Sequence, residues 1–247
     1  MGLRADPTRY LYDAGFTPDP WQADMLTSTA KRFILCISRQ AGKSLISAAM
    51  SLKEAFEQPE SLILLLSPTQ RQSSELFKDK VSRLYNALGR PIESARPRDS
   101  ATMLELKNGS RIVSLPGDEE TVRGYSGVRL LVIDEASRVP DDLYRAVRPM
   151  LAVSGGKMLA LSTPFGKRGW FFEEWHGANG WKRIKLRADE CPRITKEFLE
   201  EERIALGNFW FDQEYSCVFN DTISSLFRAE DIEATLNQSL QPVDIGI

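Results

Sequence analysis

Ser38-Arg39-Gln40-Ala41-Gly42-Lys43-Ser44 lies between an apolar run at 33–37 and a helical pattern of small residues at 45–56. Strand, tight turn with Gly-Lys-Ser, then helix is the context of a phosphate-binding loop. Backbone N–H groups at a helix N-terminus converge on one point and carry partial positive charge, so they stabilise an anion. The stretch therefore predicts a nucleoside triphosphate site, with Lys43 directed at the β- and γ-phosphates and the Ser44 hydroxyl on Mg²⁺.

This loop departs from the common spacing G-x-x-x-x-G-K-[ST]. Ile37 stands five residues before Gly42, so no glycine opens the loop, and Arg39 lies inside it. A chance Gly-Lys-Ser turn is the alternative interpretation. The remaining residues of the chain have to decide between the two.

Composition indicates an ordinary globular protein of one large α/β domain, with 247 residues, 42% hydrophobic and 27% charged. The net charge of −2 gives no global signal for nucleic acid, although a local basic face is sufficient to bind it. No apolar run approaches about 20 residues, so we expect no membrane span. Arg4, Asp6 and Arg9 near the N-terminus argue against a secretory signal.

Three scattered cysteines, Cys36, Cys191 and Cys217, have no C-x-x-C spacing. They suggest neither a zinc site nor a disulfide framework. The sequence therefore predicts a reducing, intracellular setting.

Apolar runs alternate with helical patterns along the chain. We expect short strands that are apolar throughout at 33–37, 62–66, 130–133 and 158–161, and a fifth strand at 183–186. Helices are expected at 45–56, 70–88 and 141–151, a hairpin turns at Asn108-Gly109, and a more polar helical region begins at Thr195. Strands without polar alternation are typical of a parallel sheet covered on both faces, so the predicted fold is a doubly wound α/β domain.

Two acids end the predicted strand at 130–133. Asp134 at the strand tip can hold the Mg²⁺ that bridges the β- and γ-phosphates. Glu135 points elsewhere and can orient and deprotonate the attacking water. The alternative is a strand that runs into an acidic helix cap. Together with the phosphate loop, one carboxylate for each task favours hydrolysis over binding alone.

Negative charge that develops on the transferred phosphoryl group calls for a cation nearby. Arg39 inside the loop and Arg138 after the acidic pair are the candidates. Arg138 can act in its own site or in that of a neighbouring subunit, or it can be a solvated surface charge. Arg145 and Arg148 are weaker candidates.

Two further motifs flank these residues. Ser162 and Thr163 follow the strand at 158–161 and can contact the γ-phosphate region or Glu135; an ordinary hydroxyl turn is the alternative. Gln22 can read an adenine edge with its amide, and Trp21 can pack on the base or in the core.

Basic residues gather in several stretches that can follow a phosphate backbone, or that can be solvated surface charge. These are Arg90, Arg96 and Arg98; Lys107 and Arg111; Lys167 and Arg168; and Lys182, Arg183, Lys185 and Arg187.

Taken together, these motifs resemble the ATPase domain of the terminase large subunit of tailed bacteriophages, the DNA-packaging motor. The resemblance covers roughly residues 16–230 and rests on a combination of stretches: Ser-Arg-Gln before Gly-Lys-Ser, Ser67-Pro68-Thr69-Gln70-Arg71-Gln72, Arg123-Gly124-Tyr125-Ser126-Gly127, Ser162-Thr163-Pro164 and the segment from Phe211 to Phe219.

The resemblance implies a RecA-like P-loop fold, ATP and Mg²⁺ as cofactors, and a role for each matching residue. Arg39, Lys43 and Ser44 would bind phosphate and Mg²⁺, with Ser38, Gln40, Ala41 and Gly42 completing the loop. Asp134 would hold the metal, and Glu135 would be the catalytic acid. Ser162 and Thr163 would match the coupling motif and Gln22 the adenine-reading motif. The resemblance does not decide which arginine is the arginine finger, the residue that stabilises the charge on the transferred phosphoryl group.

The resemblance also implies partners and a location. They are double-stranded DNA, the portal protein, the small terminase subunit, other copies in a ring, and the host cytoplasm with transient docking on the procapsid; no membrane is involved. We expect an ATPase domain at 1–189 and a small helical subdomain or linker at 190–247. The family's nuclease domain is expected to be absent, in an isolated domain or a split protein.

Two other functions share some of these motifs. A helicase core has the same strand-end residues, but it needs a second similar domain, for which the residues after Pro164 are too few. A nucleotide-binding switch that does not hydrolyse is the second alternative, and Glu135 argues against it.

Overall fold

A computed structural model describes residues 2–95, 102–117 and 119–221. Its centre is a seven-stranded sheet of order β3-β4-β2-β5-β6-β1-β7. Every neighbouring pair is parallel except β3 and β4, which form the hairpin predicted at Asn108-Gly109. The strands are β1 (Arg32–Ile37), β2 (Leu62–Ser67), β3 (Met103–Glu105), β4 (Arg111–Pro116), β5 (Val128–Asp134), β6 (Lys157–Ser162) and β7 (Lys182–Leu186).

Alternate side chains of the central strands enter two separate hydrophobic cores. Leu35 and Val132 belong to the core on one face, whereas Ile34 and Leu131 belong to the core on the other. Because successive side chains in a strand point to opposite faces, only a strand that is apolar throughout can supply both cores. The predicted doubly wound, mostly parallel α/β fold is confirmed.

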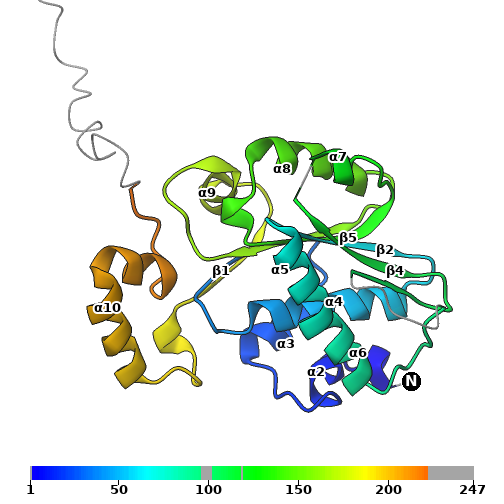
Figure 1. Ribbon diagram of the computed structural model, residues 1–247. Coiled ribbons are helices and arrows are strands. Elements are labelled where there is room, and N and C mark those ends of the chain that lie inside the picture. The colour runs from blue at the N-terminus through cyan, green and yellow to red at the C-terminus, as the bar shows by residue number, and fades with distance from the viewer. Residues whose placement is uncertain (1, 96–101, 118, 222–247) are drawn as a thin grey trace, which may run out of the picture.

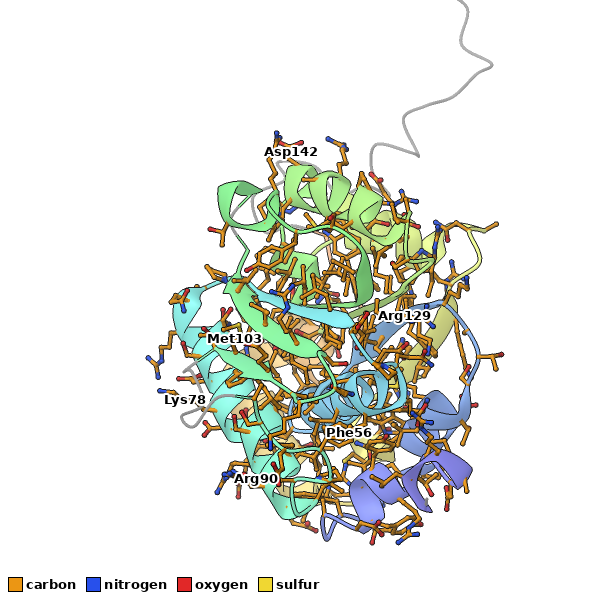
Figure 2. All side chains as sticks on the ribbon, turned by 90° about the vertical axis from the view of Figure 1, so that its right-hand side faces the viewer. Phe56, Lys78, Arg90, Met103, Arg129 and Asp142 are labelled. Carbon is orange, nitrogen blue, oxygen red and sulfur yellow. The ribbon has the colours of Figure 1, made fainter. Side chains whose placement is uncertain are left out.

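Helices cover both faces of this sheet (Figure 1). On one face lie α2 (Arg9–Tyr12), α3 (Pro20–Thr27), α4 (Lys43–Glu57), α5 (Gln70–Glu75) and α6 (Arg83–Ala87), and on the other α7 (Glu119–Val122), α8 (Asp141–Val147) and α9 (Gly169–His176). The side view places Phe56 and Asp142 on opposite sides of the sheet (Figure 2). α1 (Gly2–Ala5) precedes α2.

Two predicted helices differ in detail from the structure. The helix expected at 70–88 contains a π-helical segment, Leu76–Ser82, between α5 and α6. The helix expected at 141–151 ends in a 3₁₀ segment, Arg148–Leu151, in which Pro149 has no N–H to continue the α-helical ladder. No helix in the described ranges is long and apolar enough to cross a membrane. All three cysteines are free and buried.

The helix α10 (Lys196–Glu214) lies beside the sheet, next to β1 (Figure 1). The Thr195 hydroxyl caps it by accepting a hydrogen bond from the Phe198 N–H, and Gly207 interrupts it with φ of 73°. A small third core of Ala188, Leu199, Phe211 and Tyr215 packs beneath it. This region therefore has apolar packing of its own.

Candidate nucleotide site at the carboxyl edge of the sheet

The loop between β1 and α4 follows a tight path that requires glycine at one position. Gly42 has φ of 94°, and a Cβ added there would lie 2.8 Å from the amide nitrogen of Gln22. Gln22 is buried, and its Oε1 accepts a hydrogen bond from the Asp19 N–H at 2.9 Å. The structure therefore brings Gln22 directly against the loop, as a residue that reads a nucleotide base would need to be.

Lys43 and Ser44 open α4, where the free N–H groups of a helix start point toward the loop. The Lys43 ammonium group donates to the carbonyl oxygens of Ile37 at 2.9 Å and Ser38 at 3.1 Å, so its charge is held over the loop. Ser38 and Ala41 are buried, while Gln40 is exposed with φ of 60°. The loop thus has the positive end of a helix and one lysine on the same side.

Asp134 ends β5, one strand away from β1 across β6. Burial and the neighbouring charge of Glu135 raise the pKa of the Asp134 carboxyl to about 7, while the Lys43 ammonium group opposes this rise. Asp134 keeps partial access to solvent at the strand tip. A carboxylate that burial destabilises and that faces a lysine is placed to accept a cation.

Glu135 adopts a left-handed backbone conformation, with φ of 49°, which is uncommon for a residue other than glycine. Because of this turn, the backbone at Glu135 runs in a different direction from the strand that ends at Asp134. The Ser162 hydroxyl donates to Glu135 Oε2 at 3.4 Å, and the Ser137 and Ser162 hydroxyls are 2.7 Å apart. Strained backbone of this kind concentrates at functional sites, where the surroundings hold it in place.

Glu214 at the end of α10 joins the loop to the strand ends, and sequence reasoning missed it. Its carboxylate accepts from Arg39 Nε at 2.7 Å and from the Thr163 hydroxyl at 3.1 Å, and it lies 3.4 Å from Arg138. Burial opposes its ionisation, but the hydrogen bonds from Arg39 and Gln213 outweigh burial and lower the Glu214 pKa. The only sequence signal was its place in the segment from Phe211 to Phe219.

The sequence matches the protein family described as "Terminase large subunit, T4likevirus-type, N-terminal" over residues 34–234, most of the chain. The chain belongs to this terminase family. It is 27% identical over 254 aligned residues to the large terminase subunits of Thermus phage G20c and Thermus virus P23-45, covering 88% of this chain and 52% of each relative. The chain thus spans about half the length of these relatives.

Solved structures share the fold at low sequence identity. The ATPase domain of the Thermus phage P74-26 large terminase has a TM-score of 0.70 and 22% identity, covering 84% of this chain and 96% of that one. The large terminase of bacteriophage D6E in complex with ADP has a TM-score of 0.68 and 16% identity, covering 82% and 54%. At these identities the likeness establishes the architecture of this terminase chain.

The four arginines considered as fingers lie in different places in this terminase chain. Arg39 and Arg138 border one cavity of about 270 Å³ under α10, where Arg138 also lies over the Phe165 ring at 4.4 Å. Arg145 is exposed and pairs with Asp142. Arg148 lines a cavity at the start of β1 and β6, one strand length, or about 16 Å, from the loop. Arg148 therefore lies at the wrong edge to reach the loop of its own chain.

On the side of Gln22, the terminase chain has a second contact that sequence reasoning missed. Arg193 forms two hydrogen bonds with the Asp19 carboxylate, at 2.8 and 2.7 Å, and reaches the Ala41 carbonyl at 3.5 Å. Trp21 is partly buried and packs against the core under the sheet. Its apolar surroundings agree with the alternative in which Trp21 is a core residue.

Proposed function

We propose that this chain is the ATP-hydrolysing motor region of a large terminase, which uses Mg²⁺-ATP to move double-stranded DNA into a procapsid. The observation that carries the proposal is the convergence of Lys43 with the Asp134-Glu135 pair, which is far from it in the sequence, at one edge of the sheet. The electrostatic influence of Lys43 on Asp134 and the hydrogen bond from Ser162 to Glu135 support it.

The residues around the loop fit a magnesium ion by their chemistry. The Ser44 hydroxyl and the Asp134 carboxylate are oxygen donors, the class that Mg²⁺ prefers. Bound Mg²⁺ would supply charge neutralisation on the β- and γ-phosphates. The loop N–H groups and Lys43 would bind the phosphates, and Gln22 would contact the base.

Glu135 would then act as general base on the attacking water. Ser162, which donates to Glu135 Oε2, would orient this carboxylate, and the neighbouring Thr163 contacts Glu214. Arg39 and Arg138 are the cations close enough to stabilise charge on the transferred phosphoryl group. Because Glu214 now holds both arginines, a bound triphosphate would compete with this carboxylate. Nucleotide binding would in this way be communicated to α10.

We further propose that residues 1–189 form the ATPase domain and that residues 190–247 form a helical subdomain or linker, of which 222–247 lie outside the described residues. The third core under α10 supports this division. A ring of copies, the portal protein and the small terminase subunit would be the protein partners, in the host cytoplasm and transiently on the procapsid.

The test is steady-state phosphate release by wild type, by Glu135→Gln and by the matched control Glu173→Gln, whose side chain is exposed on α9. Loss of a general base should lower the turnover rate by about 10²- to 10⁴-fold while a fluorescent ATP analogue still binds. The control should keep the wild-type rate.

Turnover of Glu135→Gln near the wild-type rate would remove Glu135 from its role. Absence of turnover in the wild type, at every protein concentration and with DNA present, would favour a nucleotide-binding switch. A rate per subunit that rises steeply with protein concentration would indicate an arginine supplied by a neighbouring subunit.

A further inference from the structure

A second cavity, of about 390 Å³, lies at the opposite edge of the sheet, where the strands begin. Lys31 and Arg32 approach it from the start of β1, Arg148 from the segment after α8, and Trp181 from the start of β7; the loop at 152–156 closes one side. None of these residues belongs to the nucleotide site.

Three cations border this cavity, and one of them, Arg148, has an acid nearby. Among the residues that the structure describes, the side chains of Lys31 and Arg32 have no ion-pair partner. Arg148 lies over the Tyr144 ring at 5.4 Å and stands 3.9 Å from Glu174. Like charges that gather at an open cavity repel one another, so an anionic ligand would relieve the repulsion.

Glu174, the acid beside Arg148, is already occupied by other donors. It accepts hydrogen bonds from the Tyr144 hydroxyl at 2.6 Å and from the Trp181 indole N–H at 2.8 Å, and it also contacts Asn179. These bonds fix the two aromatic rings as rigid walls. The charge of Glu174 offsets part of the charge of Arg148, but none of its hydrogen bonds reaches Lys31.

The loop at 152–156, which borders the cavity, lies close against the start of β5. A Cβ on Gly156 would lie 2.2 Å from the Val128 carbonyl oxygen, so only glycine lets this loop lie flat against β5. Val153, at the loop tip, is 91% exposed. The mouth of the cavity is therefore low and open to solvent.

The basic stretches noted in the sequence are, by contrast, largely engaged within the fold. Lys182 pairs with Asp24 at 2.7 Å, Lys107 pairs with Glu93, and Arg187 pairs with Asp189 at 2.8 Å. Arg183 donates to carbonyl oxygens at the end of α9. Arg96 and Arg98 lie outside the described residues. The cations at the cavity come instead from two segments that are distant in the sequence, Lys31-Arg32 and Arg148.

We propose that the cavity bordered by Lys31, Arg32 and Arg148 binds the phosphodiester backbone of double-stranded DNA, an inference that rests on the proposed function. Phosphate contacts need lysine and arginine but no base-reading groups, and the cavity offers only cations and apolar or aromatic walls. Its volume of about 390 Å³ exceeds that of a lone phosphate ion. Binding is independent of base sequence and weakens with salt.

The test is DNA binding by the triple variant Lys31→Gln/Arg32→Gln/Arg148→Gln. Fluorescence anisotropy with two unrelated 30-base-pair duplexes, from low to physiological salt, gives the affinity and its salt slope. The matched control is Lys78→Gln/Lys80→Gln/Arg145→Gln, which removes the same charge from exposed positions outside the cavity. Melting temperature and ATP-analogue affinity of both variants establish that they fold.

Loss of three phosphate contacts should weaken DNA binding about tenfold or more and flatten the salt slope by about 2 to 3, equally on both duplexes. The single variant Lys31→Gln should flatten it by about 0.9. The control should keep most of the affinity.

Other outcomes overturn the proposal in distinguishable ways. Wild-type DNA affinity in a folded triple variant would reject the cavity and leave the ATPase proposal intact. If the wild-type protein hydrolyses ATP but binds no DNA, the cavity is also rejected as a DNA site and the ATPase proposal is kept. Stronger binding of polyglutamate than of DNA, lost in the triple variant, would make the cavity a docking site for an acidic protein. DNA binding without ATP hydrolysis would instead reject the proposed function.

Discussion

The two edges of the central sheet differ in how their charged side chains are satisfied. At the carboxyl edge, Lys43 is held by loop carbonyls, and Arg39 by Glu214. At the opposite edge, Lys31 and Arg32 border a cavity, and no acid within 2–95, 102–117 or 119–221 pairs with them. A site that performs chemistry needs preorganised groups, whereas a surface that follows a polymer backbone needs only accessible charge. This difference in how the charges are paired therefore distinguishes a candidate reaction site at the carboxyl edge from a candidate DNA-binding surface at the opposite edge.

The largest expected effect is on nucleotide binding at the loop between β1 and α4, and it tests whether the carboxyl edge is a reaction site. Lys43→Ala should weaken binding of an ATP analogue by about 10- to 100-fold, because hydrogen bonds to a charged group contribute about 1.5–3 kcal/mol. Titration of a fluorescent analogue measures it, with the exposed Lys78→Ala as control. Equal affinities in the two variants would mean that the loop is a turn without a phosphate site.

The next effect concerns the carboxylate that holds the loop arginine. Glu214→Gln removes the ion pair with Arg39, so α10 should open more often, and proteolytic cleavage within 190–214 should be about tenfold faster. The exposed Glu201→Gln on the same helix should change little.

The pH dependence of this contact has a definite sign. Because the Glu214 pKa is lower in the folded state than its ordinary value of 4.5, its contribution is present above pH 4.5. The contribution is lost as the pH falls through the lowered value. Protection of α10 that is constant from pH 8 to pH 5 and falls in stronger acid would agree with this account; uniform loss near neutral pH would contradict it.

A smaller effect is expected from the buried carboxyl at the strand tip. Burial raises the Asp134 pKa to about 7, so the folded state binds this proton more tightly than the unfolded state, and the stability is lost as pH rises from 3.8 through 7. In EDTA at pH 8, Asp134→Asn should raise the melting temperature by roughly 5 °C. The difference in melting temperature between Asp134→Asn and wild type should become smaller as the pH is lowered toward 5. An unchanged or lower melting temperature at pH 8 would show that the site already stabilises the charged form.

The smallest effect tests whether the two edges are independent. Arg148→Gln should leave ATP-analogue affinity within about twofold of wild type, because one strand length separates it from the loop and salt screens charges beyond about 8–10 Å. The same titration measures it. A large loss of turnover in this variant at high protein concentration would indicate that Arg148 acts in the nucleotide site of a neighbouring subunit.

The sequence by itself determined the sheet and the local motifs. Short-range patterns indicated the two-sided apolar strands, the Asn108-Gly109 turn, the helical region that begins at Thr195, and the path from strand to loop to helix at 33–56, because each depends on neighbouring residues. Membership in the terminase family also followed from motifs that are continuous in the sequence. The π-helical segment at 76–82 did not, because its packing against α4 has no signature in the periodic pattern.

Only the tertiary structure decided which distant groups meet. Arg39 and Glu214 are separated by 175 positions, and Asp19 and Arg193 by 174. Local patterns carry no information on such pairs, since the chain path through the whole sheet sets them. The same reason explains the cavity at the amino edge. Its cations come from two segments that are distant in the sequence, Lys31-Arg32 and Arg148, while Lys182 of the basic runs pairs with Asp24, an acid that the fold brings to it.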